Sequence, residues 1–207
     1  EIFREKINMS GVNSINWARI VCQIVYYFYA YFKFKKEEIN FSVPTGNFGD
    51  VYAGYIAKQM GLKINKLIVA TNENDILQRV INHGEYKPSE VKKSLSPSMD
   101  IQVASNFERL LYDLVNKDDQ RVKLLMEKLK TKGSFNLEVP EIKKMKDDFF
   151  AVKITDDETL KIIKEYHEKY NFTLDPHTAT AVGASKKIKK ESSTIILGTA
   201  HPYKFLE

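Results

Sequence analysis

The chain has 207 residues, of which 43% are hydrophobic and 29% charged, with a formal net charge of +5. This composition excludes an intrinsically disordered chain and provides enough apolar side chains for the core of one large domain. The single cysteine, Cys22, excludes an internal disulfide framework and is typical of proteins from a reducing compartment, so we expect a cytoplasmic location.

The N-terminal third opens with an expected long helix. Asn13 or Ser14 can cap a helix that runs to about Phe34 and carries apolar residues on more than one side. This pattern predicts a buried helix, with Cys22 inside it. The most apolar stretch, residues 20–34, is shorter than the roughly 20 residues that cross a bilayer. We therefore expect no membrane partner.

Residues 39–71 read as strand, turn, helix and strand. The strand at 39–43 ends at Pro44, the glycine-containing turn 45–50 follows, a helix covers 51–60 and ends at Gly61, and a second strand covers 66–71. A βαβ unit of this length predicts parallel strands with a right-handed crossover.

The remaining elements continue the alternation of helices and strands that is typical of α/β folds. We expect a helix at 75–82, a loop at 86–104, helices at 106–116 and 118–130, a connector at 133–140, a strand at 153–155, a helix from Asp156 or Asp157 to Tyr170, a helix opened by Asp175-Pro176, and a strand at 194–197.

Two lysine clusters, at 143–146 and 186–190, carry much of the positive charge. The second cluster raises the question of nucleic-acid binding, but no stacking aromatic residues are interspersed in it. Cations are also favoured in the last turn of a helix, so we interpret the cluster as a solvated helix end. We expect no nucleic-acid partner.

The most informative segment is the glycine turn, Gly46-Asn47-Phe48-Gly49-Asp50. A turn between a parallel strand and a helix N-terminus offers several backbone N–H groups to one anion, and glycines permit close approach and unusual torsion angles. The turn matches neither the dinucleotide-binding nor the Walker pattern. It predicts a phosphate site, with an ordinary βα turn as the alternative.

A second candidate contact lies after the last expected strand. Thr199 follows that strand, where ligands bind in open α/β sheets, and its hydroxyl suits a heterocycle nitrogen; a strand-ending turn is the alternative.

The polar cluster 71–75 suits either ligand contact or helix capping. The four histidines show no metal-ligand spacing, which argues against a zinc site.

Eight collinear segments together closely resemble threonine synthase. They are residues 13–19 (NSINWAR), 23–28 (QIVYYF), 43–50 (VPTGNFGD), 70–75 (ATNEND), 96–100 (SPSMD), 105–109 (SNFER), 175–178 (DPHT) and 199–202 (TAHP). Each segment alone is weakly specific, whereas eight in this order, spread over nearly the whole chain, are highly specific.

The resemblance implies an incomplete three-layer α/β domain of the fold-type-II (tryptophan synthase β-like) enzymes that depend on pyridoxal 5'-phosphate (PLP). It implies a lyase that converts O-phospho-L-homoserine and water to L-threonine and phosphate in threonine biosynthesis. The cofactor phosphate would bind at Gly46, Asn47, Phe48, Gly49 and Asp50, and Thr199 would contact the pyridine nitrogen. Further residues of the matched segments would contact substrate: Asn13, Ser14, Asn16 and Arg19.

The resemblance also departs from the family in one respect. No lysine of this chain lies in the motif of the family's Schiff-base lysine, and Lys204 is not its equivalent. We therefore expect residues 1–207 to be the C-terminal part of the PLP-binding catalytic region, with that lysine in a missing N-terminal part, and the fragment alone to be inactive. The alternatives are an inactive threonine-synthase-like module that binds a phosphate ligand, and another fold-type-II lyase or dehydratase.

Overall fold

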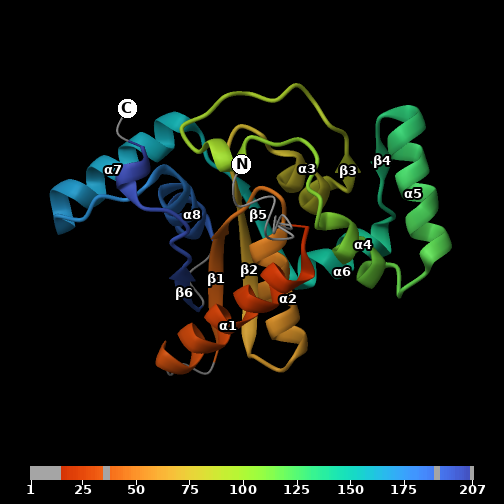
Figure 1. Cartoon of the computed structure of the whole chain (residues 1–207), viewed down its shortest axis with the longest axis horizontal. Coiled ribbons are helices and arrows are strands. Elements are labelled where there is room, and N and C mark those ends of the chain that lie inside the picture. The colour runs from red at the N-terminus through yellow and green to blue at the C-terminus, as the bar shows by residue number, and fades with distance from the viewer. Residues whose placement is uncertain (1–14, 35–37, 189–191, 206–207) are drawn as a thin grey trace, which may run out of the picture.

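The computed structural model describes residues 15–34, 38–188 and 192–205 (Figure 1). Its helices and strands follow one another as α1 (Trp17–Phe34), β1 (Ile39–Pro44), α2 (Gly49–Gln59), β2 (Ile64–Thr71), α3 (Ile76–His83), β3 (Glu85–Tyr86), the 3-10 turn η1 (Pro97–Met99), α4 (Phe107–Leu114), α5 (Asp119–Lys132), β4 (Phe135–Asn136), α6 (Val139–Asp148), β5 (Phe149–Lys153), α7 (Asp156–Tyr170), α8 (Pro176–Lys187), β6 (Ser193–Ile196) and η2 (Pro202–Lys204).

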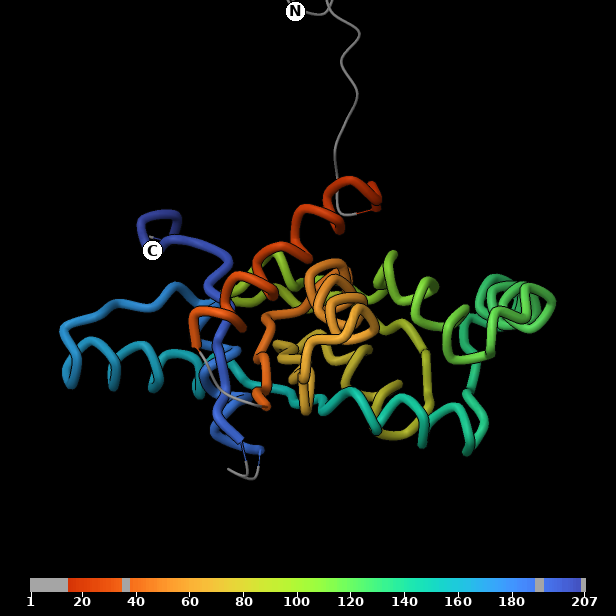
Figure 2. Tube along the Cα trace, turned by 90° about the horizontal axis from the view of Figure 1, so that it is seen from below, coloured from red at the N-terminus to blue at the C-terminus, as the bar shows by residue number. Residues whose placement is uncertain are grey.

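The main sheet has four strands in the order β5-β2-β1-β6, and every neighbouring pair is parallel. The predicted βαβ unit is confirmed, because α2 connects the paired strands β1 and β2. Strands β3 and β4 form a separate antiparallel pair. Helices α5 and α7 lie at opposite ends of the long axis of the molecule (Figures 1 and 2).

Alternate residues of β2 belong to two different cores, as the two-residue period of a strand requires. Leu67 and Val69 pack in the larger core with residues of α1 and α2. Ile68 and Ala70 pack with α8 in a smaller core. Helix α8 is also bonded to the sheet, since the buried Ser42 hydroxyl donates to the carbonyl of Ala181 at 2.7 Å. The sheet is therefore covered by helices on both faces, as in other parallel sheets.

Helix α1 corrects the expectation of a buried helix. Only Ile20, Ile24 and Tyr27 are buried, and the side chain of Cys22 is exposed. The outer side carries exposed apolar residues, namely Trp17, Val21, Val25, Tyr26, Tyr29 and Phe32. Apolar periodicity marked a wide face of the helix, but the described residues cover only one side of it.

Residues 139–155 differ most from the sequence-based expectation. Helix α6 was not predicted, and the strand expected at 153–155 lies upstream as β5 at 149–153. Glu138 and Glu141 form a reciprocal capping box at the start of α6, with Pro140 in the first turn. Lys144 donates from its Nζ atom to the carbonyl of Asp113 at 2.9 Å, so part of the first lysine cluster ties α6 to the end of α4.

The second half of the chain confirms the other expected helices with one change of cap. Thr155 caps α7, instead of Asp156 or Asp157, and its hydroxyl accepts the N–H of Glu158 at 3.2 Å. In the second lysine cluster, Lys186 and Lys187 at the end of α8 form ion pairs with Glu165 and Glu158. None of the described helices is long and apolar enough to cross a membrane.

Candidate functional site

The glycine turn lies between the C-terminal end of β1 and the first turn of α2. Its left-handed residue is Phe48, with φ of 65°, whereas neither Gly46 nor Gly49 has a positive φ. The expectation of unusual torsion angles at these glycines was therefore wrong. A left-handed conformation costs a side-chain-bearing residue roughly 1–2 kcal/mol. The buried Phe48 ring offsets this cost by packing against Phe107 and Phe149, at ring-centre distances of 5.5 and 5.6 Å.

Gly46 has no room for a side chain. A Cβ atom at this position would lie 2.7 Å from the backbone oxygen of Ser98 and 3.3 Å from the Cα atom of Met99. The missing side chain therefore permits a close contact between two backbone segments. This contact brings the glycine turn against the 3-10 turn η1, which is about fifty residues away in the sequence.

The N-terminus of α2 carries no side-chain cap. Phe48 occupies the N-cap position and makes no capping hydrogen bond with its side chain. The helical bonds begin with the N–H of Tyr52, which donates to the carbonyl of Phe48 at 3.0 Å. The N–H groups of the first turn have no carbonyl partner within a helix, and the helix dipole is positive at this end. An anion is the natural partner for these groups.

A cavity of about 510 Å³ opens at this helix end. The residues predicted for cofactor and substrate that line it are Arg19, Gly46, Asn47, Phe48, Gly49, Asp50 and Thr199. The structure thus brings together two segments that are about 150 residues apart in the sequence. Asn16 does not line the cavity, and Asn13 and Ser14 lie outside the described residues.

Asn16 and Arg19 begin helix α1. The Asn16 side chain accepts the N–H of Ala18 at 2.9 Å, so it caps the helix. Arg19 is exposed but reaches the wall of the cavity, one turn before Gln23. Arg109 of α4 supports this helix end, because its Nη2 atom donates to the carbonyl of Ile15 at 2.9 Å.

The polar cluster after β2 has a structural role. Asn72 and Asn74 are buried and donate from Nδ2 to Oδ1 of Asp100 at 2.7 and 3.0 Å. The same Asp100 oxygen accepts the hydroxyl of Ser94 at 2.6 Å. This network holds residues 94–100 against the end of β2. It thereby supports the segment that packs on Gly46.

His177 and Lys204 line the cavity but were not among the predicted site residues. The Nε2 atom of the buried His177 accepts the N–H of Ser98 at 3.2 Å, and its Nδ1 atom lies 3.2 Å from Oδ1 of Asp175. An accepting Nε2 requires the proton on Nδ1, where it can be donated to Asp175. The DPHT segment is the sequence signal that could have found His177, but in the sequence it indicates first the start of a helix at Asp175-Pro176. Asp175 does cap α8, since it accepts the N–H groups of His177 and Thr178.

We expect Asp175→Asn to remove a pH-dependent part of the stability. Burial raises the pKa of Asp175, but hydrogen bonds from His177 and Thr178 outweigh burial, so its pKa lies below the usual 3.8. A lowered pKa stabilises the folded state above pH 3.8 and loses this effect as the pH falls through the folded value. Urea unfolding should show the variant about 1.5–3 kcal/mol less stable at pH 7, with a smaller gap near pH 2. A gap that is constant with pH would contradict this assignment.

The carboxyl group of Asp50 is the unusual group of the site. Its Oδ1 atom is buried without a hydrogen-bond partner, as is Ser105 Oγ among the described side chains. Burial raises the pKa of Asp50 to about 6, although the Tyr27 hydroxyl and the charge of Arg19 lower it. The Tyr27 hydroxyl donates to the backbone carbonyl of Asp50 at 2.9 Å. A buried carboxyl oxygen without a donor is a group that a ligand can satisfy.

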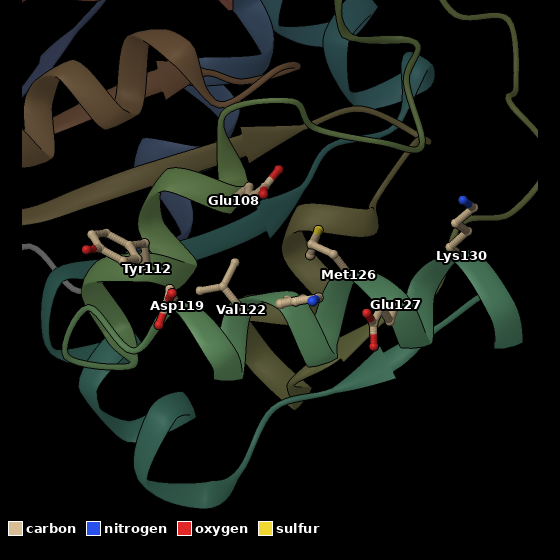
Figure 3. A pocket seen from close by; sticks show the side chains of 8 residues that line it. Glu108, Tyr112, Asp119, Val122, Met126, Glu127 and Lys130 are labelled. Atoms are coloured by element: carbon tan, nitrogen blue, oxygen red, sulfur yellow. The ribbon is translucent and has the colours of Figure 1, made fainter.

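A second hollow, of about 430 Å³, lies between α4 and α5 (Figure 3). Its wall combines the acidic Glu108, Asp119 and Glu127 with Lys123 and Lys130 around Val122 and Met126. Of the segments singled out in the sequence it contains only Glu108, from residues 105–109. The described residues also contain no group of three or more His, Cys, Asp or Glu side chains that is arranged to hold a metal ion.

No protein-family model matches the chain. Among curated proteins, the chain is 44% identical to threonine synthase of Pseudomonas aeruginosa and 43% identical to that of Saccharomyces cerevisiae, in each case over 99% of this chain. It superimposes with a TM-score of 0.92 on the crystal structure of PLP-bound threonine synthase from Brucella melitensis, at 45% identity. The chain spans about 45% of the length of these relatives. The predicted resemblance and the incomplete α/β fold are confirmed.

Proposed function

We propose that this chain is part of a threonine synthase, which converts O-phospho-L-homoserine and water to L-threonine and phosphate. The main structural support for this function is the glycine turn at the uncapped N-terminus of α2, which opens on a cavity that Thr199 also lines. The identity of 44% to a curated threonine synthase over 99% of the chain supports the proposal. Residues 1–207 would form the C-terminal part of the PLP-binding region.

The residues of the cavity fit PLP as the cofactor. Gly46 lets the turn pack closely on Ser98, the first turn of α2 provides N–H donors, and Asp50 has an oxygen without a partner. These groups would bind the cofactor phosphate, together with Asn47 and Gly49. Phe48 would hold the turn in shape from the core. When bound, PLP supplies an electron sink for carbanion chemistry.

Thr199 would orient the ring of the cofactor. Its hydroxyl would contact the pyridine nitrogen, and a neutral partner there leaves this nitrogen largely unprotonated, which moderates the electron sink. A hydroxyl also keeps the ring in one orientation, so that the reacting carbon of the substrate meets the same protein groups in each cycle. This role rests on the position of Thr199 in the wall of the cavity.

The substrate phosphate would bind near Arg19, whose guanidinium matches phosphate oxygens in geometry and charge. Arg19 is the first cation of α1 and lines the cavity. Asn13, Ser14 and Asn16 belong to the same motif and are proposed as neighbours of the substrate. The net charge of +5 favours capture of a phosphorylated amino acid.

The lysine that holds PLP would come from a part of the protein outside these residues. The relatives are more than twice as long as this chain, which leaves room for such a part. Lys204 lines the cavity but lies outside the family's lysine motif. The isolated chain would therefore be inactive. A cytoplasmic location is consistent with the single, exposed thiol of Cys22.

The deciding experiment measures phosphate release from O-phospho-L-homoserine by the full-length protein loaded with PLP. Threonine and phosphate should appear in equal amounts, and the 207-residue chain alone should release none. PLP binding without turnover would favour an inactive binding module. Turnover of serine or threonine in place of the phosphorylated substrate would favour another lyase of this fold.

We expect Thr199→Val to weaken PLP binding by about fivefold, because one hydrogen bond contributes about 1 kcal/mol. Thr199→Ser keeps the hydroxyl and should retain most of the affinity, although it loses the methyl group that the Val variant keeps. The dissociation constant from a fluorescence titration of the full-length protein measures the effect. Equal affinities for the Val and Ser variants would remove Thr199 from the cofactor contacts.

A further inference from the structure

The protonation state of the Asp50 carboxyl group decides how an anion can bind at the glycine turn. Asp50 is the second residue of α2 and lines the cavity beside Gly49. Its Oδ1 atom is buried and accepts no hydrogen bond. An ionised carboxyl group has only acceptor oxygens, and a phosphate also has only acceptor oxygens unless it is protonated. Two such groups side by side repel each other.

We propose that Asp50 binds the phosphate as a carboxylic acid, with its O–H group donating to a phosphate oxygen, so that phosphate binding takes up one proton. This inference rests on the proposed function, because it places a phosphate at the glycine turn. The proton adds to Asp50 from solvent, and no bond of the ligand is broken. In this state the carboxyl oxygen of Asp50 that lacks a partner in the free protein gains one.

The free protein is prepared for this protonation. Burial raises the pKa of Asp50 to about 6, although its position in the first turn of a helix favours the ionised form. Arg19 and Tyr27 of α1 face the carboxyl group and lower its pKa. His177 of α8 and Lys204 of η2 line the same cavity. A bound phosphate dianion adds negative charge beside Asp50 and raises its pKa further, which is the direction that the proposal requires.

The test compares the full-length protein, stripped of cofactor, with its Asp50→Asn variant. Asparagine has nearly the same shape and offers an N–H donor without titrating. Inorganic phosphate and PLP serve as probes, and calorimetric titrations in two buffers with different ionisation heats count the protons taken up. At pH 7.5 the unmodified protein should take up nearly one proton more than the variant. Asp119→Asn, an exposed acid of α5, is the matched control and should behave as the unmodified protein.

The pH dependence gives a second measurement. Above pH 6 the phosphate affinity of the unmodified protein, divided by that of Asp50→Asn, should fall about tenfold per pH unit until the pKa of the bound state is reached. The ratio cancels the ionisation of phosphate itself. If the variant does not fold, the proton count of the unmodified protein, corrected for phosphate ionisation, decides alone. Binding of both probes without extra proton uptake overturns the inference and leaves the proposed function standing. If neither phosphate nor PLP binds to the unmodified protein, both the inference and the proposed function are overturned.

Discussion

Gly46→Ala is expected to weaken PLP binding by about 10- to 100-fold. The new Cβ atom would lie 2.7 Å from the backbone oxygen of Ser98, and neither backbone segment can move aside as a flexible side chain would. A displacement of about 1 Å in a binding site costs up to a hundredfold in function. The same overpacking should lower the free energy of unfolding by about 1–3 kcal/mol. Fluorescence titration with PLP and urea unfolding measure the two effects.

Gly198→Ala is the matched control for this prediction. Gly198 adjoins Thr199, but its Cβ atom would meet only Thr178 Oγ1, at an ordinary distance of 3.8 Å. This variant should keep both its affinity and its stability. Unchanged PLP affinity in Gly46→Ala would mean that the glycine turn does not form the cofactor site, and the proposed function would lose its main structural support.

Phe48→Ala is expected to cause the largest loss of stability, about 3–5 kcal/mol, because it removes a fully buried aromatic ring. Phe48→Gly removes the same ring but relieves the left-handed backbone conformation, with φ of 65°. Glycine should therefore be the more stable of the two variants by about 1 kcal/mol. This order reverses the one found at ordinary helix positions, where alanine is preferred.

Urea unfolding of both variants checks these values. Phe172→Ala is the control, because this ring is 60% exposed and its removal should change stability by no more than about 0.5 kcal/mol. A loss below about 1 kcal/mol in Phe48→Ala would show that the turn does not depend on the core for its shape. A more stable alanine than glycine variant would contradict the role of the backbone conformation.

The βαβ unit and its glycine turn could be predicted because their signals are local. Pro44 and Gly61 mark the ends of elements, and apolar periodicity separates strand from helix. The part of the cavity wall formed by Ser98 and His177 could not be predicted in this way. The bond between Ser98 and His177 joins residues 79 positions apart, and it exists only once α8 packs on the sheet. The sequence therefore predicts the part of the site that the glycine turn and Thr199 form, and it misses the part that His177 forms.

The missed elements have similar physical causes. Pro140 lies in the first turn of α6, where proline is tolerated, but it made the segment look like a connector. Strands β3 and β4 have two residues each, and Glu85 pairs with Asn136, about fifty positions further along the chain. The exposed face of α1 is as apolar as a buried face. An apolar composition shows that a helix face can pack against another surface, but it does not show whether the described residues provide that surface.

The pairing of β1 with β6 has a consequence for the folding of the chain during its synthesis on the ribosome. β1 finds its first neighbour early, since Ile39 pairs with Ile64, but its other edge waits for β6, where Asn40 meets Thr194 after 154 further residues. At ordinary translation speeds this delay is roughly ten to thirty seconds. During this time the nascent polypeptide carries an unpaired strand edge, which makes it a client for chaperones that shield such edges.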